Sequence, residues 1–181
     1  MKKLLVICIA FLGFTIQTYA QHKYRMQEGL RIGGHIGAPM RDVTDISKLN
    51  FGADVSYLVQ VTHVFAVGGA SGFTQFTGKE VGLDGLNLKY DNFSFLPIAV
   101  SGRGKFGEKI FFSIDFGYAV GFQDDLDSGI YYQSKVGWHN GFIDLFAYYK
   151  GINAASERVV SVDNVAAIGG GIAVRLNRFI K

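Results

Sequence analysis

Residues 109–122 alternate between large apolar side chains and small or polar ones, and this alternation restricts the fold more than any other feature of the sequence. One set of alternate positions holds Ile110, Phe112, Ile114, Phe116, Tyr118, Val120 and Phe122, and the other holds Phe111, Ser113, Asp115, Gly117, Ala119 and Gly121. Successive side chains of a β-strand point to opposite faces. A period of two therefore predicts a strand whose two faces have different surroundings.

Seven further segments carry the same signal and predict strands. They are residues 28–38, 51–61, 64–75, 92–102, 130–138, 142–152 and 165–179. The chain contains 24 Gly and only 2 Pro, as expected of a twisted, strand-rich fold. Pro97 interrupts the fourth segment, where we expect a bulge or a local break, since proline cannot donate to the ladder.

The second face of these strands is mainly Gly, Ala and Ser with a few charges, which is too weakly polar for an ordinary water-facing surface. Small residues suit the crowded inside of a narrow barrel, and the apolar face then points at lipid. Lipid cannot satisfy an open sheet edge, so a spanning sheet has to close. The sequence therefore predicts an all-β fold, an eight-stranded antiparallel up-and-down transmembrane β-barrel.

The connections between the predicted strands vary in length. Residues 39–50, 76–91 and 153–164 form long connections, and 123–129 is intermediate; 62–63, 103–108 and 139–141 are shorter. Outer-membrane barrels have short periplasmic turns and longer outer loops. Asn140-Gly141 is a strong tight-turn signal. Aromatic side chains fall near the predicted membrane interfaces: Tyr57, Phe65, Tyr90, Phe122, Tyr132, Trp138 and Phe179.

Residues 1–20 read as a cleaved secretory signal peptide, which leaves residues 21–181 as the outer-membrane β-barrel. Lys2 and Lys3 precede an apolar stretch that is short for a single membrane anchor, the alternative reading. The only cysteine, Cys8, lies inside this segment, so the mature part forms no disulfide. Without Lys2 and Lys3 the 18 basic residues become 16 against 15 acidic ones, and this balance gives no case for nucleic acid.

In this register the lumen receives a polar network of four bases, three acids and one histidine. Its members are Arg31, His35, Asp54, Asp115, Lys135, Asp144, Lys150 and Arg175. We expect these groups to pair, because an unpaired buried charge is costly, and His35 to meet Asp54 on the neighbouring strand. An eight-stranded barrel is only wide enough for side chains to fill. The sequence therefore predicts a plugged lumen.

At this point the chain resembles the small porin-type outer-membrane β-barrel family of Gram-negative bacteria. The resemblance is carried by residues 29–34, 95–100, 112–121 and the Gly-rich closing segment 168–176. It implies location in the cell outer membrane and, as partners, outer-membrane lipid and the barrel-assembly machinery. It also leaves the long loops to contact an extracellular ligand.

No catalytic site, cofactor site or metal site is predicted. His63 and His139 fall at predicted turns and are expected to be solvated, and His22 lies near the start of the mature part. The cluster of Asp124, Asp125 and Asp127 has the hard oxygens that calcium prefers, although a solvated turn is the plainer reading. The favoured function is structural or surface interaction, without enzymatic activity. The alternatives are a soluble secreted barrel binding a small apolar ligand, a lipid-modifying outer-membrane enzyme and a passive channel.

Overall fold

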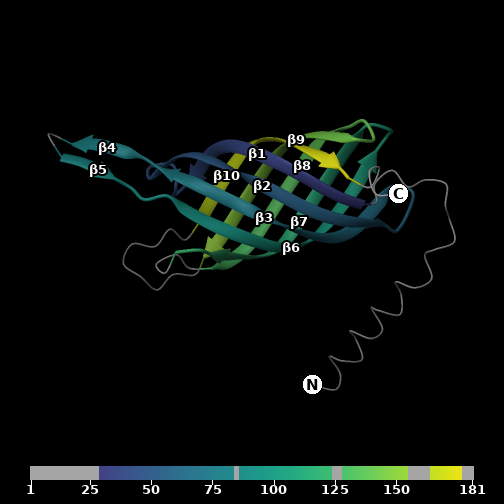
Figure 1. Ribbon diagram of the computed structural model, residues 1–181, viewed down its shortest axis with the longest axis horizontal. Coiled ribbons are helices and arrows are strands. Elements are labelled where there is room, and N and C mark those ends of the chain that lie inside the picture. The colour runs from purple at the N-terminus through teal and green to yellow at the C-terminus, as the bar shows by residue number, and fades with distance from the viewer. Residues whose placement is uncertain (1–28, 84–85, 124–127, 155–163, 177–181) are drawn as a thin grey trace, which may run out of the picture.

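The computed structural model describes residues 29–83, 86–123, 128–154 and 164–176. Within these ranges the strands are β1 (Gly29–Arg41), β2 (Ser47–Gln60), β3 (Phe65–Gly78), β4 (Glu80–Leu83), β5 (Leu86–Lys89), β6 (Phe93–Phe106), β7 (Ile110–Gly121), β8 (Gly129–His139), β9 (Ile143–Ala154) and β10 (Asn164–Arg175). Eight of them close into a barrel in the order β1-β10-β9-β8-β7-β6-β3-β2 (Figure 1). Every neighbouring pair is antiparallel, so the predicted all-β barrel of eight antiparallel strands is confirmed.

The remaining two strands, β4 and β5, form a separate two-stranded ribbon between β3 and β6. The ribbon continues beyond the rim of the barrel (Figure 1). The sequence prediction treated residues 76–91 as one loop, which is wrong. A four-residue strand is too short for its alternation to stand out in a window of sequence.

Several barrel strands extend beyond their predicted bounds. Residues 39–41 and 47–50 belong to β1 and β2, and residues 103–106 belong to β6, although the prediction placed them in connections. The turn around Asn140-Gly141 is present: Gly141 has a φ of 89°, and Asn140 Oδ1 accepts hydrogen bonds from the backbone N–H groups of Phe142 and Ile143. The connections 61–64, 107–109 and 140–142 lie at one end of the barrel, called here the short-turn end; the other is the loop end.

Pro97 interrupts the pairing of β6 without shifting its register. Ser71 pairs with Ile98 and Thr74 with Phe95, so the register is the same on both sides of the gap. On the other side, Pro97 pairs with Ala119 in an unbroken ladder with β7. Ser71 Oγ donates to the Pro97 carbonyl oxygen at 2.9 Å. The expected local break therefore occurs towards β3, and the expected bulge does not.

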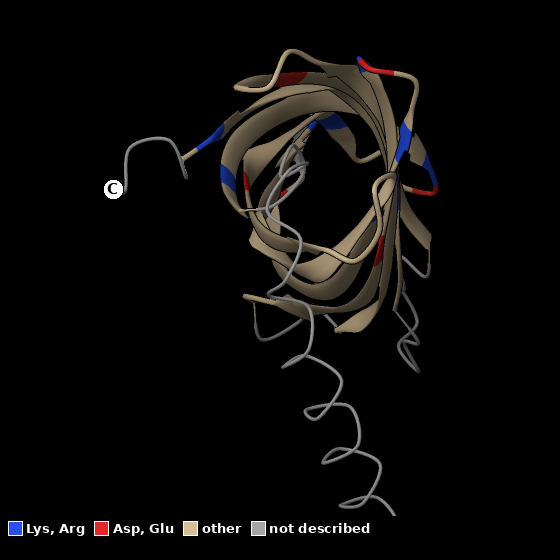
Figure 2. Cartoon of the chain, turned by 90° about the vertical axis from the view of Figure 1, so that its right-hand side faces the viewer, with Lys and Arg blue, Asp and Glu red and all other residues tan. Residues whose placement is uncertain are grey.

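The outer surface of the barrel is apolar all the way round. Every barrel strand presents large exposed apolar side chains, with Val100 71% and Phe116 62% exposed; others are Ile32, Val55, Val67, Ile114, Ile130, Leu145 and Ile172. Viewed from the short-turn end, the wall forms a closed ring in which charged positions are sparse (Figure 2). Soluble proteins rarely expose a continuous apolar surface of this kind.

Aromatic side chains lie towards both ends of this surface. Tyr57, Phe65 and Trp138 are exposed near the short-turn end, and Tyr90 and Phe122 are exposed near the loop end. Phe179, the last aromatic predicted for this role, and the predicted signal peptide lie outside the described residues. In the described part of the chain, no helix is long and apolar enough to cross a membrane.

Candidate functional site

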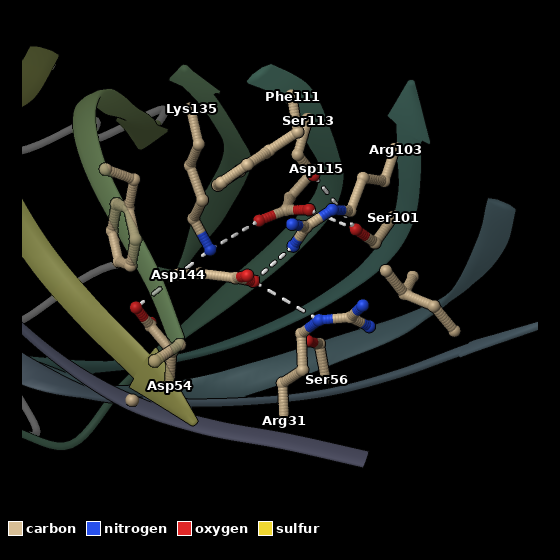
Figure 3. Close-up of a pocket in the computed structure, with 14 residues that line it drawn as sticks. Arg31, Asp54, Ser56, Ser101, Arg103, Phe111, Ser113, Asp115, Lys135 and Asp144 are labelled. Carbon is tan, nitrogen blue, oxygen red and sulfur yellow. Dashed lines mark hydrogen bonds and ion pairs between the residues drawn. The ribbon is translucent and has the colours of Figure 1, made fainter. Parts of the chain in front are cut away.

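The side chain of Asp144 is the centre of an ionic cluster inside the barrel near the short-turn end (Figure 3). One of its oxygens accepts a hydrogen bond from Arg103 Nη1 at 2.5 Å and lies 3.3 Å from Arg31 Nε. The other oxygen lies 2.6 Å from His139 Nδ1. The Arg103 guanidinium also sits 3.6 Å from the centre of the Phe111 ring. One carboxylate thus holds groups from β1, β6 and β8 together.

Two members of this cluster were misjudged from the sequence. Arg103 was assigned to a connection, but it lies in β6 and points into the barrel. His139 was expected to be solvated at a turn, but only 3% of it is exposed, because β8 continues through it to the Asn140-Gly141 turn. His139 lies two residues beyond Gly137 in the alternation. This spacing was the overlooked signal that its side chain points into the barrel.

A second group of charges lies further along the lumen. Asp115 accepts a hydrogen bond from Ser101 Oγ at 2.5 Å and forms an ion pair with Lys135 at 3.1 Å. The same ammonium group lies 4.0 Å from Asp54. Ser113 Oγ is 3.4 Å from Ser101 Oγ. Lys135 therefore links the carboxylates of β2 and β7 across the barrel.

His35 connects these charges to a third group. Its Nδ1 lies 3.0 Å from Asp54, as the register predicted, and its Nε2 lies 2.6 Å from Lys150 Nζ. Gly52 pairs with His35 across β1 and β2. A Cβ at Gly52 would come within 2.9 Å of the imidazole, so glycine leaves the space that the ring occupies.

Lys150, although only 1% exposed, also has polar neighbours beyond His35. It donates to Thr74 Oγ1 at 3.1 Å, and the same oxygen accepts from Asn50 Nδ2 at 2.9 Å. The Asn50 oxygen accepts from the Tyr148 hydroxyl at 3.0 Å. Sequence reasoning missed Asn50 because it assigned this residue to a loop, and it missed Thr74 because it looked only for charged groups and histidines.

The loop end of the lumen is filled differently. Buried apolar side chains from six barrel strands and the β1–β2 turn meet there, with Phe76 and Phe93 stacked at 5.0 Å between ring centres. The members at this end include Val43, Phe76, Phe95, Tyr131, Ile152 and Val165. The Tyr131 hydroxyl donates to Gln133, which faces the charged part of the lumen.

The structure thus places seven of the eight predicted lumen residues in two groups of contacts. Arg31 meets Asp144 in one, and His35, Asp54, Asp115, Lys135 and Lys150 form the other. The eighth, Arg175, pairs with Arg31 in the β1–β10 ladder and is half-buried at the short-turn end. Asp124, Asp125 and Asp127, considered for calcium, lie outside the described residues. In the described ranges, no group of three or more acids, histidines or cysteines is arranged to hold a metal ion.

One arrangement resembles catalytic machinery. Asp54, His35 and Thr74 form an acid–imidazole–hydroxyl chain, with 3.4 Å between His35 Nε2 and Thr74 Oγ1. A nucleophile needs a free base and room for a substrate. Here Lys150 lies against Nε2, and Thr74 is 1% exposed. This environment makes a buried hydrogen-bond network and offers no place for a substrate.

A closed antiparallel barrel of eight strands is the fold of small outer-membrane β-barrel proteins, and comparison with solved structures finds this fold. The chain is similar to the attachment invasion locus protein Ail of Yersinia pestis in complex with the heparin analogue sucrose octasulfate, at 14% identity and a TM-score of 0.56, covering 82% of this chain and 96% of Ail. A second Ail structure matches at 13% identity with a TM-score of 0.54, covering 82% and 99%. No family model matches the chain, and no curated protein matches it significantly.

Proposed function

We propose that this protein is a non-enzymatic barrel of the Gram-negative outer membrane, with a lumen plugged by its own side chains and a role in surface interaction. The observation that carries the proposal is the exposed apolar belt around a closed barrel. A continuous apolar surface is unfavourable in contact with water and favourable in contact with lipid. Closure satisfies the backbone groups that lipid could not.

The packing of the lumen supports the plug. One cavity, lined by Arg31, Asp54, Arg103 and Lys135 among others, has a volume of about 30 Å³. Another, beside Pro97 and Gln133, has about 10 Å³. These volumes correspond to about one to three water molecules each at most. They are too small for the apolar ligand of the soluble-barrel alternative, and they favour a plug over a channel.

The β4–β5 ribbon supports a role at the cell surface. It extends from the loop end, the outward end of an outer-membrane barrel (Figure 1). It pairs with no other described strand, so both of its edges are available for strand addition by a polypeptide. The similar protein Ail was crystallised with a heparin analogue, but in this chain Arg41 at the end of β1 is followed by Asp42 and Asp45 in the β1–β2 turn. A polypeptide partner therefore fits this end better than a polyanion.

The membrane proposal is tested by the mobility of the protein on a gel. The outer-membrane fraction is loaded unheated and boiled, and we expect a faster, compact band only in the unheated sample. Recovery in the soluble fraction without a mobility shift would overturn the proposal. The plug is tested by conductance in planar bilayers, where steady open-channel current would refute it.

The orientation is tested with two epitope insertions. One is placed at residues 84–85, between β4 and β5, and the other at the Asn140-Gly141 turn. We expect antibody to label the first on intact cells and the second only after permeabilisation. The reverse pattern would remove the basis for a surface role of the ribbon.

A further inference from the structure

The charges inside the lumen do not balance. Four basic side chains lie deep in the lumen, namely Arg31, Arg103, Lys135 and Lys150, against three carboxylates, namely Asp54, Asp115 and Asp144. Arg175 and Lys105 lie on the same face at the short-turn end, half-buried, and add to the positive charge there. Lys135 lies near two of the carboxylates. Arg31 and Arg103 share the third, so the excess positive charge falls at the ionic cluster.

The two arginines also have unused hydrogen-bond donors. All three guanidinium nitrogens of Arg31 are buried without a hydrogen-bond partner, although Nε forms an ion pair with Asp144, and Nε and Nη2 of Arg103 also lack a hydrogen-bond partner. The side chains are only 4% and 5% exposed. A buried donor without an acceptor loses the hydrogen bonds that it made to water, and this loss is larger on a charged group. Such donors are therefore expected to meet an acceptor inside the barrel.

Both arginines line the cavity of about 30 Å³ (Figure 3). We propose that this cavity binds one small monatomic anion of the halide class, held by Arg31 and Arg103. The volume is that of about two or three water molecules, which is too little for an oxyanion with five heavy atoms. Water molecules would supply acceptors but no charge, whereas a halide supplies both.

The remaining wall of the cavity is mixed. Ser101 and Ser113 contribute hydroxyl groups, and Phe111 and Phe146 contribute aromatic rings. Asp54, Asp115 and Lys135 also line the cavity, and the Lys135 ammonium group lies against both of these carboxylates. Asp144 lies on the same cavity and is the one carboxylate in contact with both arginines. Asp144 offsets only one of the two guanidinium charges, so one positive charge is left at the two arginines for the anion to offset.

The first experiment locates the anion directly. The full chain is crystallised from bromide in place of chloride, and anomalous diffraction is recorded at the bromine edge. We expect an anomalous peak inside the cavity, in contact with guanidinium nitrogens of Arg31 and Arg103. Water-like density without an anomalous signal would overturn the proposal, and this outcome needs no variant to fold.

The second experiment measures the effect of chloride on thermal unfolding at constant ionic strength, with gluconate as the bulky replacement. The midpoint is expected to rise by about 3–6 °C for each tenfold increase in chloride above its Kd. Arg31→Gln should abolish this rise, and Lys109→Gln, at the same end but exposed, should retain it. An equal chloride response in Arg31→Gln, or a bromide peak with no chloride response in the wild type (an adventitious ion only), would overturn the site.

Discussion

The two halves of the lumen have the same wall and different fillings. The ionic half, at the short-turn end, holds Arg31, Arg103, Asp144, Asp115 and Lys135. The apolar half, at the loop end, is filled by Val43, Phe76, Phe95, Ile152 and Val165. Both halves bury their side chains, but different interactions hold them. The apolar half depends on shape and volume, whereas the ionic half depends on matching each charge to a partner.

This difference predicts a different response to small chemical changes. Volume-conserving changes are tolerated in an apolar core, which repacks. An isosteric change that removes a charge is not tolerated in a buried cluster, because the partners keep their charges and lose their compensation. The stability of the barrel should therefore depend on chemistry at one end and on size at the other.

Among changes that keep the size of the side chain, Asp144→Asn should have the largest effect. The change keeps the shape of the side chain but leaves Arg31 and Arg103 facing no carboxylate, and breaking a buried pair costs about 3–5 kcal/mol. The free energy of unfolding is measured by urea titration of the refolded barrel in detergent, using the fluorescence of Trp138, the only tryptophan. Asp91→Asn, at an exposed position, is the control. A loss below about 1 kcal/mol would show that the cluster is not a structural element.

Ser101→Ala should have the next largest effect. Ser101 donates to the Asp115 carboxylate at 2.5 Å, and a hydrogen bond to a charged group is worth about 1.5–3 kcal/mol. The matched change is Ser71→Ala, which removes a hydrogen bond to the neutral carbonyl of Pro97 and should cost about 0.5–1.5 kcal/mol. The same urea titration compares the two. Equal losses would mean that charge adds nothing in the ionic half.

The contrast between the halves was only partly visible in the sequence. Alternation at residues 110–121 fixed which side chains face inward, and it led to Asp115 and its neighbours. The signal faded at strand ends, where residues 103–106 carry glycine and charge and resemble a turn although they continue β6. For this reason the predicted lumen network did not include Arg103.

The filling of the loop end was missed for another reason. Phe76 and Val43 were assigned to connections, and Phe95 lies beside Phe93 and Leu96, where apolar residues occupy both faces. Sequence cannot say which of these enters the lumen, because the choice depends on how the strands tilt and meet across the barrel. The pairing of particular charges across the barrel depends on the same geometry.

Phe76→Leu tests the tolerance of the apolar half. Phe76 is fully buried and stacks on Phe93, yet leucine keeps most of its volume, so we expect a loss of about 1–1.5 kcal/mol. Phe76→Ala should cost about 3–5 kcal/mol, since it leaves a cavity. Both are read from the midpoint and slope of urea unfolding. If leucine lowered the free energy of unfolding as much as alanine does, the apolar half would be as sensitive to small chemical changes as the ionic half.

Tyr131→Phe should have the smallest effect and locates the boundary between the halves. The Tyr131 ring belongs to the apolar cluster, while its hydroxyl donates to Gln133 on the polar side. Phenylalanine keeps the ring contacts and removes one neutral hydrogen bond, which is worth about 0.5–1.5 kcal/mol. Gln133→Leu removes the acceptor from the other side, and the double variant measures their coupling. If the two losses simply add, the hydroxyl acts independently of Gln133 and the boundary lies elsewhere. If the double variant loses less than the sum, this hydrogen bond joins the two fillings of the lumen.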